Sequence, residues 1–272
     1  MNYACINGEF CNTDNAMIGI QDMALQRGYG MFDFFKVMGG QPVFLDDHLD
    51  RFWESARLLR LPITLSRESL TKQIHQLIEM NQWSDAGIRM TLTAGYAPDG
   101  YSIHEPNLLM SGQSVQLPDT LSEKSIRLFS YAHQRQLPLI KSIDYLMAVW
   151  IQDEVKKAEA DEVLYHQGGW ISECPRANIF LVTATGVLVT PGEQVLQGIT
   201  RKKILQVAEK ITRIETRPVH LNEFKTAREA FITSTTKLLT PVAVVDGIPV
   251  GTGGPGELSR VLFEEYSKLL PA

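Results

Sequence analysis

The sequence has few of the residues that cross-link a small fold through disulfides or bind a metal. It contains three cysteines, Cys5, Cys11 and Cys174, an odd number with no Cys-x-x-Cys pair among them. No two of its six histidines have the spacing of metal ligands. The sequence therefore predicts neither a disulfide framework nor a metal site.

Long apolar runs and an excess of basic residues are also missing. No run of about 18 apolar residues occurs, so we expect no membrane span. A formal net charge of −5 argues against a nucleic-acid partner. The first residues do not combine a basic stretch with an apolar one, so we expect no secretory signal and a cytoplasmic location.

The composition is that of a globular protein. Hydrophobic residues make up 44% and charged residues 21% of the 272 residues, enough to bury a sizeable core. A polar stretch at 113–122 indicates a linker between an N-terminal domain, 1–112, and a C-terminal domain, 123–272. Strands and helices alternate without a strict βαβ rhythm, which predicts an α+β or mixed α/β fold.

Local patterns predict the principal elements. Residues 34–44 indicate a hairpin, followed by a helix that Asp46 or Asp47 caps, with an apolar stripe at helical spacing. Ser66 is the expected cap of a second helix over 68–80. Further helices are predicted at 145–158, 201–211 and 257–270. Strands are predicted at 88–93, 107–110, 126–131, 162–165, 179–183, 187–189, 230–233 and 242–245.

Six separated segments hold the residues that suggest chemistry. They are RGYGMFD (27–33), HLDR (48–51), KSIDYL (141–146), ECPRANIF (173–180), GITR (198–201) and TSTT (233–236). In this order the series resembles the fold type IV enzymes that use pyridoxal 5′-phosphate (PLP). That family includes branched-chain aminotransferases, D-amino-acid aminotransferases and aminodeoxychorismate lyases. The resemblance extends from about residue 7 to residue 241.

The resemblance implies an architecture and an assembly. We expect a small N-terminal α/β domain and a larger, barrel-like C-terminal domain, with PLP between them. The family forms homodimers in which a loop of one subunit covers the site of the other, so we expect a homodimer. The partners implied are small amino and oxo acids.

Lys141 is the expected catalytic residue. PLP chemistry needs a lysine that forms an imine with the cofactor and later carries the substrate proton. Lys141 follows the apolar pair Leu139 and Ile140 and precedes an apolar helix start, a setting that favours a desolvated amine. Without the family series, the same residue would be interpreted as a surface lysine at a strand end.

The resemblance assigns the cofactor ligands. Glu173 is placed beside the pyridine nitrogen, which a carboxylate keeps protonated. Arg51 is placed at the phosphate, although it could equally be a helix arginine paired with Asp47 or Glu54. Tyr145 matches a tyrosine that bonds the ring oxygen, but Asp144 replaces the usual asparagine and the spacing to Lys141 is one residue shorter.

The remaining phosphate contacts are expected at a helix start and in a hydroxyl-rich run. Ile199 and Thr200 open the GITR helix, and Thr200 could be its N-cap. Ser234 and Thr235 are the expected hydroxyl contacts, with plain β-strand propensity as the alternative explanation.

Two arginines are the candidates for binding a substrate carboxylate. Arg27 precedes Gly-Tyr-Gly, and Arg89 lies in an apolar strand, where a solvent-facing position is the alternative. Phe32 and Thr236 are also placed at the substrate by the resemblance.

Together these residues favour a PLP-dependent aminotransferase of the D-amino-acid or branched-chain type. The alternative is 4-amino-4-deoxychorismate lyase, because the stretches Gly100–Ser102 and Gly169–Cys174 are similar to those of the lyases.

Overall fold

The computed structural model describes residues 2–115 and 120–271, which form two compact units. Unit 1 contains residues 2–115, Ile140–Asp144 and Pro271. Unit 2 contains residues 120–139 and Tyr145–Leu270. Residues 116–119 of the expected linker lie outside the described residues. No helix of the described residues is both long and apolar enough to cross a membrane.

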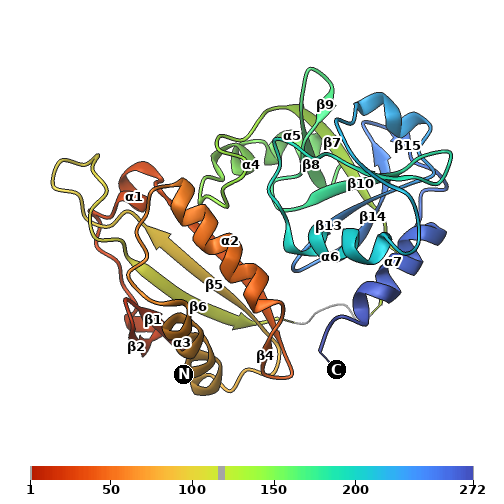
Figure 1. Cartoon of the computed structure of the whole chain (residues 1–272). Coiled ribbons are helices and arrows are strands. Elements are labelled where there is room, and N and C mark those ends of the chain that lie inside the picture. The colour runs from red at the N-terminus through yellow and green to blue at the C-terminus, as the bar shows by residue number, and fades with distance from the viewer. Residues whose placement is uncertain (1, 116–119, 272) are drawn as a thin grey trace. The chain divides into compact units, whose positions relative to one another are not determined.

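Unit 1 is an antiparallel sheet with two long helices (Figure 1). The strand order is β2-β1-β6-β5-β3-β4. Its elements are β1 (Tyr3–Ile6), β2 (Glu9–Asn12), the 3₁₀ helix η1 (Thr13–Asn15), α1 (Met23–Arg27), β3 (Gly30–Met38), β4 (Gln41–Pro42), α2 (Leu45–Leu58), α3 (Arg67–Met80), β5 (Ala86–Thr93) and β6 (Leu108–Ser114).

The core of unit 1 forms because strand and helix patterns agree on one face. In β3, Met31, Phe35 and Val37 point inward with period two. In α2, Leu49 and Phe52 form part of an inward stripe at helical spacing, as the sequence predicted. The opposite face of β3 and β5 is left for side chains that do not belong to this core.

Unit 2 is built on a nine-stranded mixed sheet. The strand order is β12-β11-β10-β13-β14-β7-β8-β9, with β15 paired to β14. Its elements are β7 (Ile126–Ala132), α4 (Leu146–Trp150), α5 (Gln152–Lys157), β8 (Glu162–Gln167), β9 (Trp170–Ile171), β10 (Asn178–Val182), β11 (Leu188–Thr190), α6 (Ile199–Ala208), β12 (Ile214–Thr216), η2 (Leu221–Lys225), β13 (Glu229–Ser234), β14 (Leu238–Val245), β15 (Ile248–Pro249) and α7 (Glu257–Ser267).

Two helix caps and the continuity of one helix differ from the sequence prediction. Helix α2 is preceded by Phe44 in a left-handed conformation (φ 51°), and Asp46 and Asp47 lie in its first turn without capping it. There they still favour the helix, because carboxylates interact well with its positive end. The helix predicted at 145–158 breaks into α4 and α5 at the buried Ile151. By contrast, Ser66 caps α3 as predicted, accepting a bond from the Ser69 N–H.

The third difference concerns the start of α6, where Gly198 is the N-cap and Thr200 lies in the first turn. The predicted N-cap role of Thr200 is therefore wrong. Strand β6 is also longer than predicted and continues to Ser114, because its backbone pairs with β5 as far as Ala86.

Candidate active site

Unit 1 holds Lys141 against the first residues of β3. The Lys141 carbonyl accepts a hydrogen bond from the Phe32 N–H (2.9 Å), and the Ile143 N–H donates to the Gly30 carbonyl (3.1 Å). A Cβ at Gly30 would lie 2.9 Å from the Leu92 carbonyl oxygen and 3.1 Å from the Ile143 side chain. The glycine therefore permits the close approach that fixes the backbone of Lys141 beside Phe32.

The ring of Phe32 brings two predicted site residues together. The Lys141 Nζ lies 4.5 Å and the Arg89 Cζ 3.8 Å from its centroid, and Phe32 is only 4% exposed. Arg89 is an exposed residue on the sheet face away from the core, because its neighbour Met90 points into that core. Both cations interact favourably with the ring face.

The surroundings of Lys141 are less apolar than the sequence suggested. Ile140 is buried, but Leu139 is 52% exposed, and Leu146 at the helix start is 80% exposed. The apolar contact of the amine is instead supplied by Phe32, a residue more than a hundred positions away in the sequence.

Arg51 is paired with a buried aspartate of β3, a partner outside its own helix. Its Nε and Nη2 donate to the two carboxylate oxygens of Asp33, each at 2.8 Å. His48 Nδ1 lies 2.7 Å from the same carboxylate. Asp33 is fully buried, which opposes its ionisation, but Arg51 and His48 hold its pKa well below the usual range. Burial lowers the pKa of His48, even though Asp33 opposes this.

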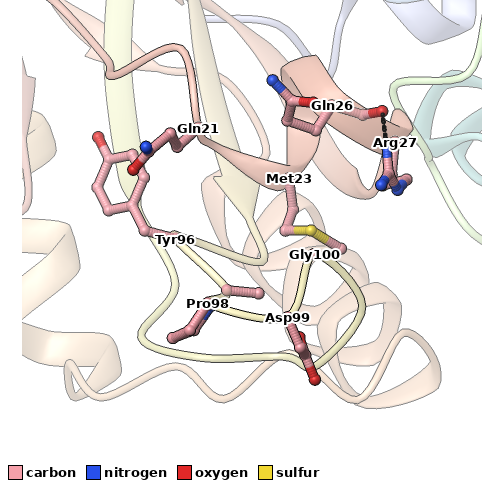
Figure 2. A pocket seen from close by; sticks show the side chains of 9 residues that line it. Gln21, Met23, Gln26, Arg27, Tyr96, Pro98, Asp99 and Gly100 are labelled. Atoms are coloured by element: carbon pink, nitrogen blue, oxygen red, sulfur yellow. Dashed lines mark hydrogen bonds between the residues drawn. The ribbon is translucent and has the colours of Figure 1, made fainter.

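Arg27 lies at the end of α1, where it borders a hollow of about 610 Å³. Figure 2 shows Met23 of α1 on one side of this hollow and Pro98 and Asp99 on the other. The Arg27 guanidinium lies 5.2 Å from the centroid of the exposed Tyr101 ring. The structure thus places Arg27 with the 96–101 loop.

Unit 2 surrounds Glu173 with hydrogen-bond donors. Arg135 Nε donates to Oε1 at 2.8 Å. The Leu196 N–H donates to Oε2 at 2.9 Å, and the Asn178 amide lies 3.4 Å from it. Glu173 is 4% exposed. A buried carboxylate held in this way is suited to pairing with a protonated ring nitrogen.

The start of α6 fits an anion such as a phosphate. Gly198 caps the helix without a side-chain hydrogen bond, and a Cβ on it would lie 2.1 Å from Asn178 Oδ1. The Thr233 side chain, opposite Asn178 in the sheet, has a buried hydroxyl without a hydrogen-bond partner in the described part of the chain. A helix N-terminus with an unsatisfied hydroxyl nearby is a favourable place for negative charge.

The side chains in the first turn of α6 are buried and held by the protein. Ile199 and Thr200 are 5% and 4% exposed. Thr200 hydrogen-bonds the hydroxyl of Tyr266 in α7, while burial raises the pKa of Tyr266 to about 12. The Thr200 side chain is therefore held by the protein, and its backbone N–H remains the group suited to a ligand.

The other predicted residues of unit 2 lie at the ends of elements or in a turn. Ser234 ends β13, and its hydroxyl accepts the Lys237 N–H at 3.1 Å. Thr235 is half-buried and Thr236 exposed in the turn that follows. Tyr145 is half-buried and precedes α4 as its N-cap residue. The roles of these residues toward a cofactor or substrate stay predictions.

Several residues of these clusters were missed by the sequence analysis. Asp33 could have been found, because a charge between Phe32 and Phe34 in an apolar strand needs a buried partner. Arg135 gave no comparable signal, since its partner Glu173 is 38 positions away. The orphan hydroxyl of Thr233 was likewise visible only in the structure.

Comparisons with known proteins agree with this geometry. Residues 30–245 match the family described as amino-transferase class IV, so the chain belongs to this family. It is 28% identical to the D-alanine aminotransferase of Bacillus licheniformis, over 93% of this chain and 92% of that protein. It is 29% identical to a putative branched-chain-amino-acid aminotransferase of Methanocaldococcus jannaschii, over 97% of this chain and 95% of that protein.

The fold has solved counterparts. The branched-chain amino acid aminotransferase of Escherichia coli superimposes with a TM-score of 0.87 at 25% identity, covering 96% of this chain and 91% of that one. Another branched-chain amino acid aminotransferase, solved with pyridoxamine 5′-phosphate, gives a TM-score of 0.89 at 24% identity over 97% of this chain and 92% of its own. The mixed α/β, fold type IV architecture expected from the sequence is thereby confirmed, as is an enzyme of the class IV aminotransferase family.

Proposed function

We propose that the protein is a PLP-dependent aminotransferase that moves an amino group between a small amino acid, of the D-amino-acid or branched-chain type, and a 2-oxo acid. The observation that carries this is the Phe32 ring with Lys141 and Arg89 each within 5 Å of its centroid. The Lys141 amine would act at the carbon that carries the amino group, and the Arg89 guanidinium would bind the carboxylate. The two side chains lie next to each other, as the amino and carboxylate groups of an amino acid do.

Two sets of residues would hold the cofactor. Lys141 would bind its aldehyde carbon and Arg51 its phosphate, and both belong to unit 1. In unit 2, Glu173 would pair with the ring nitrogen, and the N–H groups of Ile199 and Thr200 with the phosphate. Ser234 and Thr235 would donate hydroxyls to it, and Tyr145 would bond the ring oxygen.

The bound cofactor supplies an electron sink that stabilises negative charge at the substrate Cα. The amine of Lys141 would take the proton from Cα, hold it, and return it to the carbon on the far side of the substrate nitrogen. Arg89 and Arg27 bind the carboxylate and so orient the Cα–H bond. Phe32 limits access of water to the amine, and Thr236 borders the substrate.

Substrate half-reactions are the direct test. Purified protein should show the visible absorption band of lysine-bound PLP, and D-alanine, D-glutamate or L-leucine should each be tried for bleaching it by amination. Lys141→Ala should lose the band, whereas Lys156→Ala, which changes an exposed lysine, should keep it. Protein that stays colourless after reconstitution would contradict the PLP proposal.

The second candidate, 4-amino-4-deoxychorismate lyase, keeps the same cofactor set and has one observation in its favour. The loop at Gly100–Ser102 is similar to that of the lyases, and Arg27 contacts it through Tyr101. Release of 4-aminobenzoate and pyruvate from aminodeoxychorismate, with no amination by any amino acid, would establish the lyase instead.

We further propose that the enzyme is a homodimer. Leu146, Val149 and Trp150 lie on one side of α4 and are between 64% and 80% exposed. Apolar side chains exposed together in this way commonly mark a protein interface. Trp150→Glu should shift the sedimentation coefficient toward that of a monomer, while the control Trp170→Glu, at an exposed tryptophan of β9, should not.

A further inference from the structure

Glu162 is a buried carboxylate outside the ligand set described above. It is the first residue of β8 and is 4% exposed. A charge at such a position is costly unless other groups compensate it. The Val163 N–H lies 3.3 Å from Oε1, and two cationic side chains of the described residues reach Oε2, Arg176 at 3.4 Å and Lys237 at 3.8 Å.

The two cations come from two different turns. Arg176 lies in a tight turn closed by hydrogen bonds in both directions between Cys174 and Ala177, directly after Glu173. Lys237 lies in the turn between β13 and β14, directly after Ser234, Thr235 and Thr236. One carboxylate is therefore tied to the segment beside Glu173 and to the segment that contains Thr235.

Burial shows which partner is the fixed one. The side chains of Arg176 and Lys237 are 67% and 39% exposed, whereas that of Glu162 is 4% exposed. The strand holds the carboxylate, and the cations reach in to it from turns at the surface. Burial raises the pKa of the Cys174 thiol, the charges of Glu162 and Glu173 raise it further, and that of Lys237 opposes them.

We infer that Glu162 is a positioning residue of the cofactor site, which holds in place both the turn next to Glu173 and the turn that contains Thr235. This inference rests on the proposed function, in which Glu173 pairs with the ring nitrogen and Thr235 with the phosphate. The contacts of Glu162 with Arg176 and with Lys237 would support opposite ends of the PLP molecule, so losing one should be distinguishable from losing the other. Loss of the Arg176 contact should affect binding of the PLP ring, and loss of the Lys237 contact should affect binding of the phosphate.

The experiment compares binding of PLP with binding of pyridoxal, which lacks the phosphate, to cofactor-free full-length protein. Glu162→Gln should weaken PLP binding by about tenfold or more, as expected when a charged hydrogen-bonded group is neutralised. Lys237→Met should weaken PLP binding but leave pyridoxal binding unchanged. Arg176→Met should weaken both. Glu123→Gln, which neutralises an exposed partner of Arg260, is the matched control and should bind both as the wild type does.

Melting temperatures of the cofactor-free variants separate positioning from general stability. A lower melting temperature of Glu162→Gln with wild-type affinity for PLP and pyridoxal would overturn the inference. If Glu162→Gln does not fold, wild-type affinities in both Arg176→Met and Lys237→Met would overturn it as well. Failure of the wild-type protein to bind PLP would instead overturn the proposed function.

Discussion

Each unit of the molecule contains a buried pair of an arginine and a carboxylate, and the proposed function gives the two pairs opposite tasks. In unit 1, Arg51 and Asp33 have side chains 9% and 1% exposed. In unit 2, Arg135 and Glu173 have side chains 15% and 5% exposed. The proposed ligand of PLP is the cation in the first pair and the anion in the second.

The difference follows from how the partners are held. Asp33 accepts from Arg51, from His48 and from the Phe34 N–H, so its oxygens are committed to the protein. A guanidinium has five N–H donors, more than one carboxylate accepts, and it can serve a phosphate as well. Arg135 donates to Glu173 and to the Pro138 carbonyl, and so it supports the carboxylate of Glu173. Glu173 also accepts from the Leu196 N–H and from Asn178, so both carboxylates are well supplied with donors. The two pairs differ instead in where the donors of the arginine go.

The largest effect should come from removing the supporting acid of unit 1. Asp33→Ala leaves Arg51 and His48 buried without their shared partner, and breaking such a pair costs about 3–5 kcal/mol of unfolding free energy. Urea denaturation measures this change, and PLP affinity should fall with it. The control is Asp50→Asn, at an exposed acid paired with Arg67. If Asp33→Ala loses no more unfolding free energy than the control, the pair of Asp33 and Arg51 does not stabilise unit 1.

Removing the proposed ligand of unit 2 should affect catalysis more than stability. Glu173→Gln keeps the shape but loses the charge opposite the ring nitrogen, so the rate of the half-reaction should fall on the order of 100-fold. Arg135→Met, which removes only the support, should reduce the same rate less. Stopped-flow absorbance measures both rates. Equal losses in the two variants would contradict the division of tasks.

The pair of unit 1 should also make stability depend on pH. Burial lowers the pKa of His48 below its ordinary 6.5, so the unfolded chain binds the proton more readily. Stability should therefore fall as the pH drops below about 6.5, by roughly 1.4 kcal/mol for each unit of pKa difference. It should fall again below the ordinary 3.8 of Asp33, whose pKa Arg51 and His48 hold lower in the folded protein.

Urea denaturation of the wild type and of His48→Asn between pH 7 and pH 5 checks the first step. Asparagine can still offer a hydrogen bond near the Nδ1 position, but it does not titrate. The variant should have a flatter profile in this window, and a slope identical to that of the wild type would assign the dependence to another group.

The smallest effect should come from an ion pair of the same kind on the surface. Arg57 and Glu54 form a two-bonded pair within α2, with side chains 68% and 54% exposed. Water screens such a pair, so Glu54→Gln should leave the urea midpoint unchanged within error. A clear destabilisation would mean that the hydrogen-bonded contact itself, and not its burial, accounts for the contribution of the two buried pairs to stability.

The sequence predicted the candidate site more completely than it predicted the contacts that hold the site. Lys141, Glu173 and Arg51 became candidates through their order along the chain, which a family series preserves. Arg135 lies outside the six segments, and Asn178 and Thr233 lie inside two of them but gained a role only when β10 and β13 paired. The partners considered for Arg51 were helix neighbours, whereas the structure shows it paired with Asp33, on a different element 18 positions away.

The sequence by itself determined the family, the mixed α/β class, the caps and stripes of helices such as α3, and the residue types suited to PLP. Those features depend on local patterns, which a chain shows without folding. Only the tertiary structure decided which charges are buried together, that Phe32 is the apolar partner of Lys141, and that Glu162 joins two turns. Burial and pairing between distant residues arise when strands and helices pack, so they are properties of the folded chain alone.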